Sequence, residues 1–322
     1  MRLIRCLSDF KGTPNGVALA IGNFDGFHKG HQSVIECMKE KARKLDLVPA
    51  VMIFEPQPLE FFSKDKSPAR LYSLRDKLQA LEVAGVKIVF CMKFNAAFAA
   101  LSAREFVIDL LYKKLQVKSV TVGSLFNFGE GGKYTIDDLK KLGSEVGMEA
   151  SAIDGVLLNH ERISSTKIRE YLFHGQLDLA KEALGRYYSM SGIVVHGNQI
   201  GRNLGFPTAN VNINRRISPL RGVYAVKVLS KVSLYDGMAN VGYRPTVVAG
   251  QNKALLEVNL FNFKQDLYGE SIRVFFISKI RDEVKFSNIE VLQEQLLADK
   301  KKAKEILAKL QYLKTLLHRG SY

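Results

Sequence analysis

Two histidines, His28 and His31, have the side chains and the spacing best suited to chemistry on a phosphate group. They lie in the stretch GNFDGFHKGH at residues 22–31, which also contains three glycines. Imidazole N–H groups can stabilise the charge that develops on phosphate oxygens during phosphoryl or nucleotidyl transfer. Glycines let the backbone approach a ligand closely. We therefore predict that both histidines are catalytic, although two structural histidines at helical spacing would give the same pattern. The predicted phosphate-binding residues of this stretch are Gly22, Asn23, Phe24, Asp25, Gly26 and Gly30.

A second group of polar residues, ISSTKIR at residues 163–169, opens a predicted helix. Hydroxyls and basic side chains at a helix start suit an anion, because the first N–H groups of a helix have no partner within it. We predict that the three hydroxyls, with Lys167 and Arg169, form a second anion site. An ordinary capped helix is the alternative, and the presence of the histidine motif in the same chain favours the phosphate site.

A third group lies in the second half of the chain, where residues 201–210 have the sequence GRNLGFPTAN. Gly201 and Gly205 permit close approach to phosphates. Thr208 and Asn210 offer oxygen atoms, the ligands that Mg²⁺ prefers, and residues two apart in an extended segment point to the same side. The segment is therefore either a phosphate and magnesium site or a turn-rich connection between strands, and its composition alone leaves both readings open.

A single carboxylate, Glu257, interrupts the predicted strand LLEVNL at residues 255–260. In an alternating strand, Leu256, Val258 and Leu260 share one face and Glu257 lies on the other. Glu257 is therefore either an ordinary exposed carboxylate or a general base at the mouth of a barrel. The alternation favours neither reading.

The composition of the 322-residue chain suits one large domain or two ordinary ones. Its net charge of +15 is compatible with nucleic-acid binding, but small polyanions such as ATP attract the same charge. The densest basic run, KKKAK at residues 300–304, lies in a predicted helix, and we expect it to be a solvated helix face. We therefore do not expect nucleic acid to be the main partner.

The cysteines and the hydropathy pattern predict a cytoplasmic protein. The three cysteines, Cys6, Cys37 and Cys91, are widely spaced, which fits a reducing compartment and argues against disulfides or a zinc site. No apolar run approaches the roughly 20 residues that a membrane span needs. We expect no membrane contact and no leader segment.

The first 185 residues alternate short apolar runs with helical patterns. The runs at residues 17–21, 50–54, 88–92 and 119–122 predict strands, and capping boxes at Ser73 and Ser102 predict helix starts. Continuous apolar strands between amphipathic helices predict a Rossmann-like α/β domain with a parallel sheet. Ligands of such sheets bind beyond the carboxyl ends of the strands, which is where residues 22–31 lie.

The pattern changes after a predicted helix at residues 178–184, for which Gly185 is the expected stop. Short strand-like runs separated by turn residues then follow, and they predict a small antiparallel β-barrel. These runs are 190–195, 222–228, 238–241, 255–260 and 272–277. A capping box at Ser287 and Glu290 opens a long C-terminal helix. We therefore predict two domains, residues 1–185 and 186–322.

Together these segments resemble the bifunctional bacterial riboflavin kinase/FAD synthetase family, over nearly the whole chain and in the family's order. GNFDGFHKGH and ISSTKIR are similar to the two signatures of its adenylyltransferase module. GFPTAN at residues 205–210 is similar to the flavokinase signature, and NVGYRPT at 240–246, Glu257 and DLYG at 266–269 also match that module. The His-x-Gly-His signature occurs in many nucleotidyltransferases, whereas the flavokinase signature is far more specific.

The resemblance implies two reactions, both with ATP as co-substrate. In the kinase reaction Glu257 would be the base on the riboflavin 5′-hydroxyl, which attacks the γ-phosphorus of ATP to give FMN, while Thr208 and Asn210 coordinate Mg²⁺. In the adenylyltransferase reaction the FMN phosphate attacks the α-phosphorus of a second ATP to give FAD and pyrophosphate. His28 and His31 would stabilise the α-phosphate charge. Ser164, Thr166 and Arg169 would hold the outgoing phosphates.

The chain departs from the family pattern at four positions. Leu125 and Asn127 in GSLFNFG at residues 123–129 replace an acidic and a basic residue, and Gln57 and Asn259 stand where histidine is usual or common. Leu125, Asn127 and Gln57 fall in the region expected to shape the flavin side of the adenylyltransferase site, whereas little is expected to follow from Asn259. Leu125 and Asn127 are therefore flavin-side candidates. They also raise an alternative function, a riboflavin kinase whose N-terminal module has lost or altered its adenylyltransferase activity.

Overall fold

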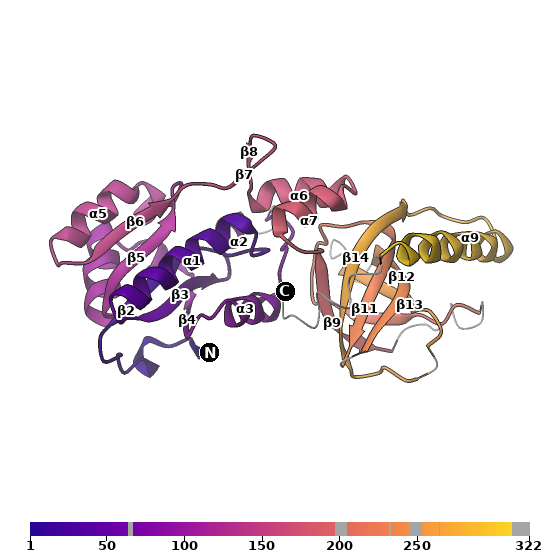
Figure 1. Ribbon diagram of the computed structural model, residues 1–322, viewed down its shortest axis with the longest axis horizontal. Helices are drawn as coiled ribbons and strands as arrows, with labels where there is room; N and C mark the ends of the chain where they lie inside the picture. Colours follow the sequence, from indigo (N-terminus) through magenta and orange to yellow (C-terminus); the bar gives the residue numbers. More distant parts are fainter. Residues whose placement is uncertain (64–66, 197–204, 232, 245–252, 264, 311–322) are drawn as a thin grey trace. The chain divides into compact units, whose positions relative to one another are not determined.

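The computed structural model divides into two compact units (Figure 1). The first contains residues 1–68 and 77–164, and the second contains residues 69–76 and 165–322. The structure describes residues 1–63, 67–196, 205–231, 233–244, 253–263 and 265–310. The predicted boundary between the two functional modules, after residue 185, stays a prediction. The compact units are defined by contacts within the structure, and such units need not coincide with functional modules.

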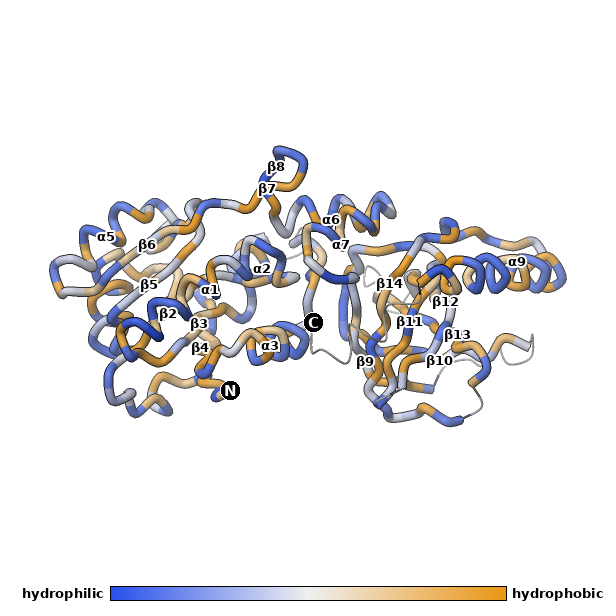
Figure 2. The backbone as a smooth tube through the Cα atoms, in the orientation of Figure 1, coloured by the Kyte–Doolittle hydropathy of each residue, from blue (hydrophilic) through white to orange (hydrophobic). Residues whose placement is uncertain are grey.

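The described part of the first unit contains a six-stranded parallel sheet in the order β1-β4-β3-β2-β5-β6. This confirms the predicted parallel sheet, and each predicted strand lies within an observed one. The strands are β1 (Arg2–Ile4), β2 (Val17–Ile21), β3 (Val48–Glu55), β4 (Ile88–Lys93), β5 (Val117–Gly123) and β6 (Glu149–Ile153). Every residue of β2 is buried, and hydrophobic residues dominate the neighbouring strands (Figure 2).

Helices pack against this sheet. Helix α1 lies against β2, β3 and β5, a π-helical segment at Glu105–Lys114 lies against β5, and α5 lies against β6. The Ser102 capping box forms as predicted, with Glu105 Oε2 accepting the Ser102 N–H at 2.8 Å, but the segment that follows is π-helical. The α-helices of this part are α1 (Lys29–Lys44), α2 (Pro58–Ser63), α3 (Leu74–Val83), α4 (Ala96–Ala99) and α5 (Ile136–Ser144), and β7 (Leu157–Leu158) pairs with β8 (Glu161–Arg162).

The second unit contains a closed antiparallel barrel with the strand order β10-β13-β12-β11-β14-β9, which confirms the predicted barrel. Its strands are β9 (Ser189–Val195), β10 (Ala209–Asn212), β11 (Gly222–Ser230), β12 (Ser233–Arg244), β13 (Lys253–Leu260) and β14 (Ser271–Arg281). Helices α6 (Ser165–Phe173) and α7 (Leu177–Leu184) pack together ahead of the barrel in sequence. Gly185 ends α7 with φ 76°, as expected for a helix stop.

Helix α9 (Ile289–Ala308) covers β11, β12 and β14. Its cap is Asn288, whose side-chain oxygen accepts the Val291 N–H at 2.9 Å, and not the predicted Ser287. Ala303 and Leu307 of α9 join the hydrophobic cluster on the outside of the barrel, and hydrophobic and hydrophilic residues alternate along the helix (Figure 2). None of the described helices is both long and apolar enough to cross a membrane.

The lysine run on α9 differs in part from the solvated face that we predicted. The Lys300 ammonium lies 5.5 Å from the ring centroid of Phe206 and 5.8 Å from that of Phe261. Lys302 donates a 3.1 Å hydrogen bond to the carbonyl oxygen of Ile280. The cation–π contacts of Lys300 and the hydrogen bond of Lys302 direct these two ammonium groups toward the barrel.

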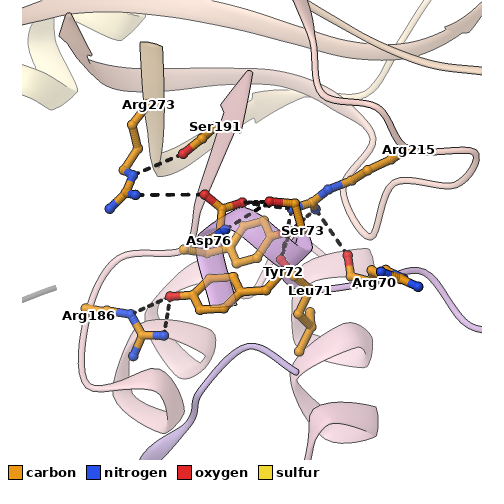
Figure 3. A network of polar contacts seen from close by, with 10 residues as sticks. Arg70, Leu71, Tyr72, Ser73, Asp76, Arg186, Ser191, Arg215 and Arg273 are labelled. Atoms are coloured by element: carbon orange, nitrogen blue, oxygen red, sulfur yellow. Dashed lines mark hydrogen bonds and ion pairs between the residues drawn. The ribbon is translucent and has the colours of Figure 1, made fainter. Parts of the chain in front are cut away.

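Residues 69–76 belong to the second unit although both neighbouring segments belong to the first. Figure 3 shows how this strap, residues 69–76, is held by side chains of the barrel unit. The Tyr188 hydroxyl donates to the carbonyl oxygen of Leu71 at 3.0 Å, and Arg186 donates to the Tyr72 hydroxyl at 2.9 Å. Arg215 donates to the carbonyl oxygens of Arg70 and Leu71, each at 3.1 Å.

The carboxylate of Asp76 lies at the end of the strap, buried between two arginines. Its oxygens lie 3.9 Å from a terminal nitrogen of Arg215 and 3.8 Å from one of Arg273 (Figure 3). The Asp76 N–H donates to the Ser73 hydroxyl at 3.1 Å, and this hydroxyl donates to the Asp76 carboxylate at 2.6 Å, so Ser73 caps α3 as predicted. Asp76, in the first turn of α3, therefore also pairs with arginines of the barrel unit that are distant in sequence.

Candidate functional site

The histidine motif forms the first turn of α1. His28 is the cap of this helix, and its Nδ1 accepts the backbone N–H of His31 at 3.3 Å. In a neutral imidazole the proton must then be on Nε2, so this nitrogen of His28 is a hydrogen-bond donor. The two imidazole rings stack with centroids 3.6 Å apart, and the Phe24 ring meets that of His31 edge-on at 5.2 Å. The structure therefore brings both predicted histidines together at the positive end of a helix.

The loop between β2 and α1 has an unusual backbone. Phe24, Gly26 and Phe27 have φ values of 47°, 76° and 42°, in the left-handed region that few side chains adopt. Phe24 and Phe27 are nevertheless buried, so packing holds them in this conformation. A Cβ atom on Gly30 would lie 3.2 Å from the His28 ring, which explains the glycine between the histidines.

Two further predicted residues of the loop point away from solvent. The side-chain oxygen of Asn23 is buried and has no hydrogen-bond partner among the described residues. Asp25 is also buried. A buried amide oxygen without a partner is costly in a free protein and suits a site that a ligand completes.

The second phosphate motif begins beside the first but is divided between the units. The carbonyl oxygen of Ile163 lies 4.0 Å from the Cβ position of Gly30. Ser164 is the last residue of the first unit, whereas Thr166 and Arg169 stand in α6 of the second unit. The Arg169 Nε donates to the carbonyl oxygen of Ala69 in the strap, which fixes the direction of its guanidinium.

A group of aromatic rings at the carboxyl ends of β3 and β4 was not predicted from the sequence. We call Phe54, Phe61, Phe62, Phe94 and Phe98 the phenylalanine cluster; its ring centroids lie 5.2–5.8 Å apart. Phe62 is 63% exposed, so the cluster has an open side. β2, which leads into the histidine loop, lies next to β3 in the sheet. Phe54 ends the predicted strand at 50–54 and Phe94 follows the one at 88–92, which is the signal that the sequence offered for this cluster.

The flavin-side candidates lie in the turn after β5. Leu125 and Asn127 are both exposed, while the rings of Phe126 and Phe128 stack with centroids 5.8 Å apart. Gln57, at the end of β3, is buried, and its side-chain nitrogen has no hydrogen-bond partner among the described residues. These three residues, which depart from the family pattern, therefore lie at the carboxyl edge of the sheet. The Gln57 side chain is turned inward, and those of Leu125 and Asn127 are turned outward.

The candidate kinase residues form a row across three strands of the barrel. Asn210 of β10 stands opposite Glu257 of β13, and Glu257 stands opposite Asn240 of β12. Residues directly opposite on paired strands share one face of a sheet. Glu257 is half-buried in this row, flanked by an amide side chain on each side.

The oxygen atoms of this region suit a hard cation. The side-chain oxygens of Asn210 and Asn240 are buried and have no hydrogen-bond partner among the described residues. Over those residues, no group of three or more His, Cys, Asp or Glu side chains could hold a metal ion. The side chains of Thr208 and Asn210 offer hydroxyl and amide oxygens, which suit Mg²⁺ better than a softer metal. Gly205 has open space around it, and Gly201 lies outside the described residues.

A cavity of about 540 Å³ adjoins Thr208. This volume is within the usual range for small-molecule sites. The cavity is lined by Val194, Pro207, Thr208, Ala209, Leu260, Phe263, Gln265, Asp266, Leu267 and Tyr268. Tyr268 stacks on His196 with ring centroids 3.8 Å apart. One wall of the cavity is thus the flavokinase-like segment at 205–210, and the other is the segment at 266–269.

Two titratable groups outside these sites have structural roles. Burial, with the nearby Glu55 carboxylate, raises the pKa of the Cys91 thiol, so this thiol is a poor nucleophile. Burial also raises the pKa of Tyr224, whose hydroxyl donates to the carbonyl oxygen of Arg221 at 2.8 Å. Neither group competes with the histidines or Glu257 as a catalytic candidate.

Comparisons with known proteins identify a family for each half of the chain. Residues 11–167 match the FAD synthetase family and residues 184–307 match the riboflavin kinase family. A bifunctional riboflavin kinase/FMN adenylyltransferase of Escherichia coli K12 is 44% identical over 307 residues, which cover 95% of this chain and 97% of the relative. A protein of the same name from Haemophilus influenzae is 42% identical, covering 94% and 98%.

A solved structure has the same fold over nearly the whole chain. It is a crystal structure from Streptococcus pneumoniae described as a macrolide-efflux protein, with a TM-score of 0.79 and 33% sequence identity. The match covers 94% of this chain and 98% of that one. With both family matches in order and near-complete coverage by the curated relatives, the chain belongs to the bifunctional riboflavin kinase/FMN adenylyltransferase family.

Proposed function

We propose that this bifunctional enzyme performs its two reactions with two separate sets of residues. The chain is a riboflavin kinase and an FMN adenylyltransferase, and ATP is the co-substrate of both activities. The alternative of a lost adenylyltransferase activity is not favoured, because the FAD synthetase match covers residues 11–167 and includes the complete histidine motif.

The kinase reaction is proposed to use Glu257 as its general base. Glu257 would accept the proton of the riboflavin 5′-hydroxyl, whose oxygen then attacks the γ-phosphorus of ATP, and ADP would leave. The row formed by Asn210, Glu257 and Asn240 is the observation that carries this proposal, because it sets a carboxylate among amides near the cavity at Thr208.

The cation of the kinase reaction is proposed to be Mg²⁺, held by oxygens of Thr208 and Asn210. When bound, the ion would neutralise charge on the ATP phosphates. The buried side-chain oxygen of Asn210, which lacks a partner among the described residues, supports this role. Asn210 and Glu257 stand opposite each other in the ladder, so the cation ligand would lie beside the base that accepts the hydroxyl proton.

The adenylyltransferase reaction is proposed to take place at the carboxyl edge of the parallel sheet. The FMN phosphate is already an anion, so it can attack the α-phosphorus of ATP without a general base, and pyrophosphate would leave. The Nε2–H of His28, together with His31, would donate hydrogen bonds to the α-phosphate oxygens. Ser164, Thr166 and Arg169 would hold the pyrophosphate.

The flavin ring in this reaction is proposed to lie against the phenylalanine cluster. Planar aromatic ligands gain from contact with aromatic side chains, and Phe62 presents an exposed ring on the side of the sheet where ligands of this fold bind. Leu125 and Asn127, which follow β5 at the same edge, would border the ring.

The remaining aspects of the function are also proposals. Three free cysteines fit a reducing cytoplasm. The partners are riboflavin, FMN, FAD and ATP, with no nucleic acid as main partner; the efflux description belongs to the Streptococcus protein alone. Incubation with FMN, ATP and Mg²⁺ tests the adenylyltransferase directly. FAD and pyrophosphate in equal amounts are expected, and no FAD at full enzyme recovery would restore the alternative.

A further inference from the structure

Asn259 holds the segment that leads into β10. Its side-chain nitrogen donates a 2.7 Å hydrogen bond to the carbonyl oxygen of Pro207, and the residue is buried. Only the NH₂ group of the amide can donate to a carbonyl, so this bond also fixes which way the amide is turned. The other side-chain atom, the amide oxygen, is buried without a partner among the described residues.

This hydrogen bond stands where the backbone ladder stops. The ladder between β10 and β13 pairs Ala209 with Val258 and Asn210 with Glu257. One step further in this register, Thr208 would be opposite Asn259, but β10 begins only at Ala209. The side chain of Asn259 therefore continues the connection to β13 beyond the last ladder pair.

The position of Asn259 relates it to both parts of the proposed kinase site. Asn259 and Glu257 are two apart on β13, so their side chains lie on the same face. Pro207 directly precedes Thr208, which lines the cavity. A bond from Asn259 to Pro207 therefore limits how far Thr208 can move relative to Glu257.

We infer that Asn259 is a positioning residue for the kinase reaction, whose amide holds Pro207 so that Thr208 stays in place beside Glu257. This inference rests on the proposed roles of Thr208 and Glu257. It gives a function to a residue whose departure from the family pattern had no expected consequence. Asn259 itself needs no contact with the reacting atoms.

Two variants test the hydrogen bond. Asn259→Ala removes the donor, and a displaced Thr208 is expected to lower kcat for FMN formation about 10- to 100-fold. Asn259→Asp keeps the shape but has no donor while it is ionised. Protonation restores an O–H donor, and burial raises the pKa of such a carboxyl. The activity of this variant relative to the wild type should therefore rise as the pH falls from about 8 to about 6.

A readout independent of catalysis completes the test. Hydrogen–deuterium exchange of the free protein should show faster exchange of residues 205–211 in both variants at pH 8, with the parallel sheet unchanged. Asn212→Asp is the matched control, because it adds the same charge at an exposed position of β10 whose oxygen accepts from the Asn214 N–H. Its relative activity should not depend on pH.

The outcomes separate this inference from the function on which it rests. Wild-type kcat in both variants at pH 8 would overturn the positioning role. A loss in Asn259→Asp that is equal at both pH values would show that hydrogen-bond donation is not the cause, and would also overturn it. Absence of FMN formation by the wild-type enzyme would instead contradict the proposed kinase function.

Discussion

Asn210, Glu257 and Asn240 stand opposite one another on three paired strands, whereas His28 and His31 stand on a loop and the first turn of a helix. The kinase residues all belong to one compact unit. The adenylyltransferase candidates are divided, with the histidines and Ser164 in the first unit and Thr166 and Arg169 in the second. The two proposed sites are thus built by two different structural means.

The difference has a physical consequence for each site. Strand register fixes which side chains share a face, so the kinase row is maintained by backbone hydrogen bonds that do not depend on the residues in it. The histidine site depends instead on left-handed residues in a buried loop and on a glycine that leaves room for a ring. Substitutions should therefore act locally in the kinase row and more broadly in the histidine loop.

The largest expected effect is at Glu257. Glu257→Gln removes the proposed base while keeping its size, so FMN formation should fall about 10³-fold, within the range for general bases. FAD formation from supplied FMN should continue at the wild-type rate, because that reaction uses the other set of residues. Chromatography of riboflavin, FMN and FAD measures both reactions.

The exposed Glu294→Gln on α9 is the matched control, and both of its rates should equal those of the wild type. An unchanged rate of FMN formation in Glu257→Gln would show that Glu257 is an ordinary surface carboxylate.

The next largest effect is expected at His28, where FAD formation and not FMN formation should be lost. His28→Ala removes both the cap of α1 and the proposed donor to the α-phosphate, so FAD formation should fall about 10²- to 10³-fold. FMN formation from riboflavin should be preserved. His174→Ala, at an exposed position, should affect neither rate. Equal losses of both activities in His28→Ala would contradict the separation of the two sets.

A third prediction concerns the strap. Asp76→Asn keeps the hydrogen bond to Ser73 but removes the carboxylate that faces the buried Arg215 and the half-buried Arg273, so the second unit should lose about 3 kcal/mol of unfolding free energy. Denaturant unfolding measures the loss, and hydrogen exchange shows whether it falls on the barrel strands. The exposed Glu82→Gln on the same helix is the control. Destabilisation confined to the parallel sheet would contradict the place of the strap in the second unit.

A fourth and smaller effect tests the crowding in the histidine loop. Gly30→Ala places a Cβ 3.2 Å from the His28 ring, which must shift by a few tenths of an ångström, and FAD formation should fall about 10-fold. In Gly123→Ala the nearest atom would be 3.9 Å away, so no loss is expected there. A Gly30→Ala variant with full adenylyltransferase activity would mean that the position of the His28 ring does not limit the reaction.

The smallest effect should be at the phenylalanine cluster. Phe62→Ala removes one exposed ring, and the loss of an aromatic contact should raise KM for FMN about 3- to 10-fold with little change in kcat. Phe173→Ala, at a similarly exposed ring on α6, should leave KM unchanged. A lower kcat at constant KM would argue that Phe62 supports the fold of the site and does not contact the flavin.

Local sequence patterns predicted much of this fold. The parallel sheet follows from continuous apolar runs such as Val17–Ile21, and the barrel follows from closely spaced strands with turn residues. The edge strands β1 and β6 were not predicted, because β1 is only three residues long and β6 is partly exposed, with small residues at most of its positions. The cap of α9 was predicted one residue early, because Ser287 and Asn288 are both good caps and only the chain geometry selects one.

Contacts between distant segments could not be predicted in the same way. The strap belongs to the second unit because of Arg186, Arg215 and Tyr188, which lie more than 100 residues away in sequence. The sequence identified Glu257 but left it as either an exposed carboxylate or a general base. Alternation along a strand shows which face a residue is on, but it does not show which residues lie beside it on that face. The pairing of β13 with β10 and β12 supplied its neighbours.

The most direct test of the central claim is a chromatographic time course with riboflavin, excess ATP and Mg²⁺. Two separate sets of catalytic residues in one chain predict that FMN appears first and is then converted to FAD, with ADP and pyrophosphate as the two by-products. Accumulation of FMN without FAD would contradict the claim that residues 22–31 form a working adenylyltransferase site, and absence of FMN would contradict the role of the Glu257 row.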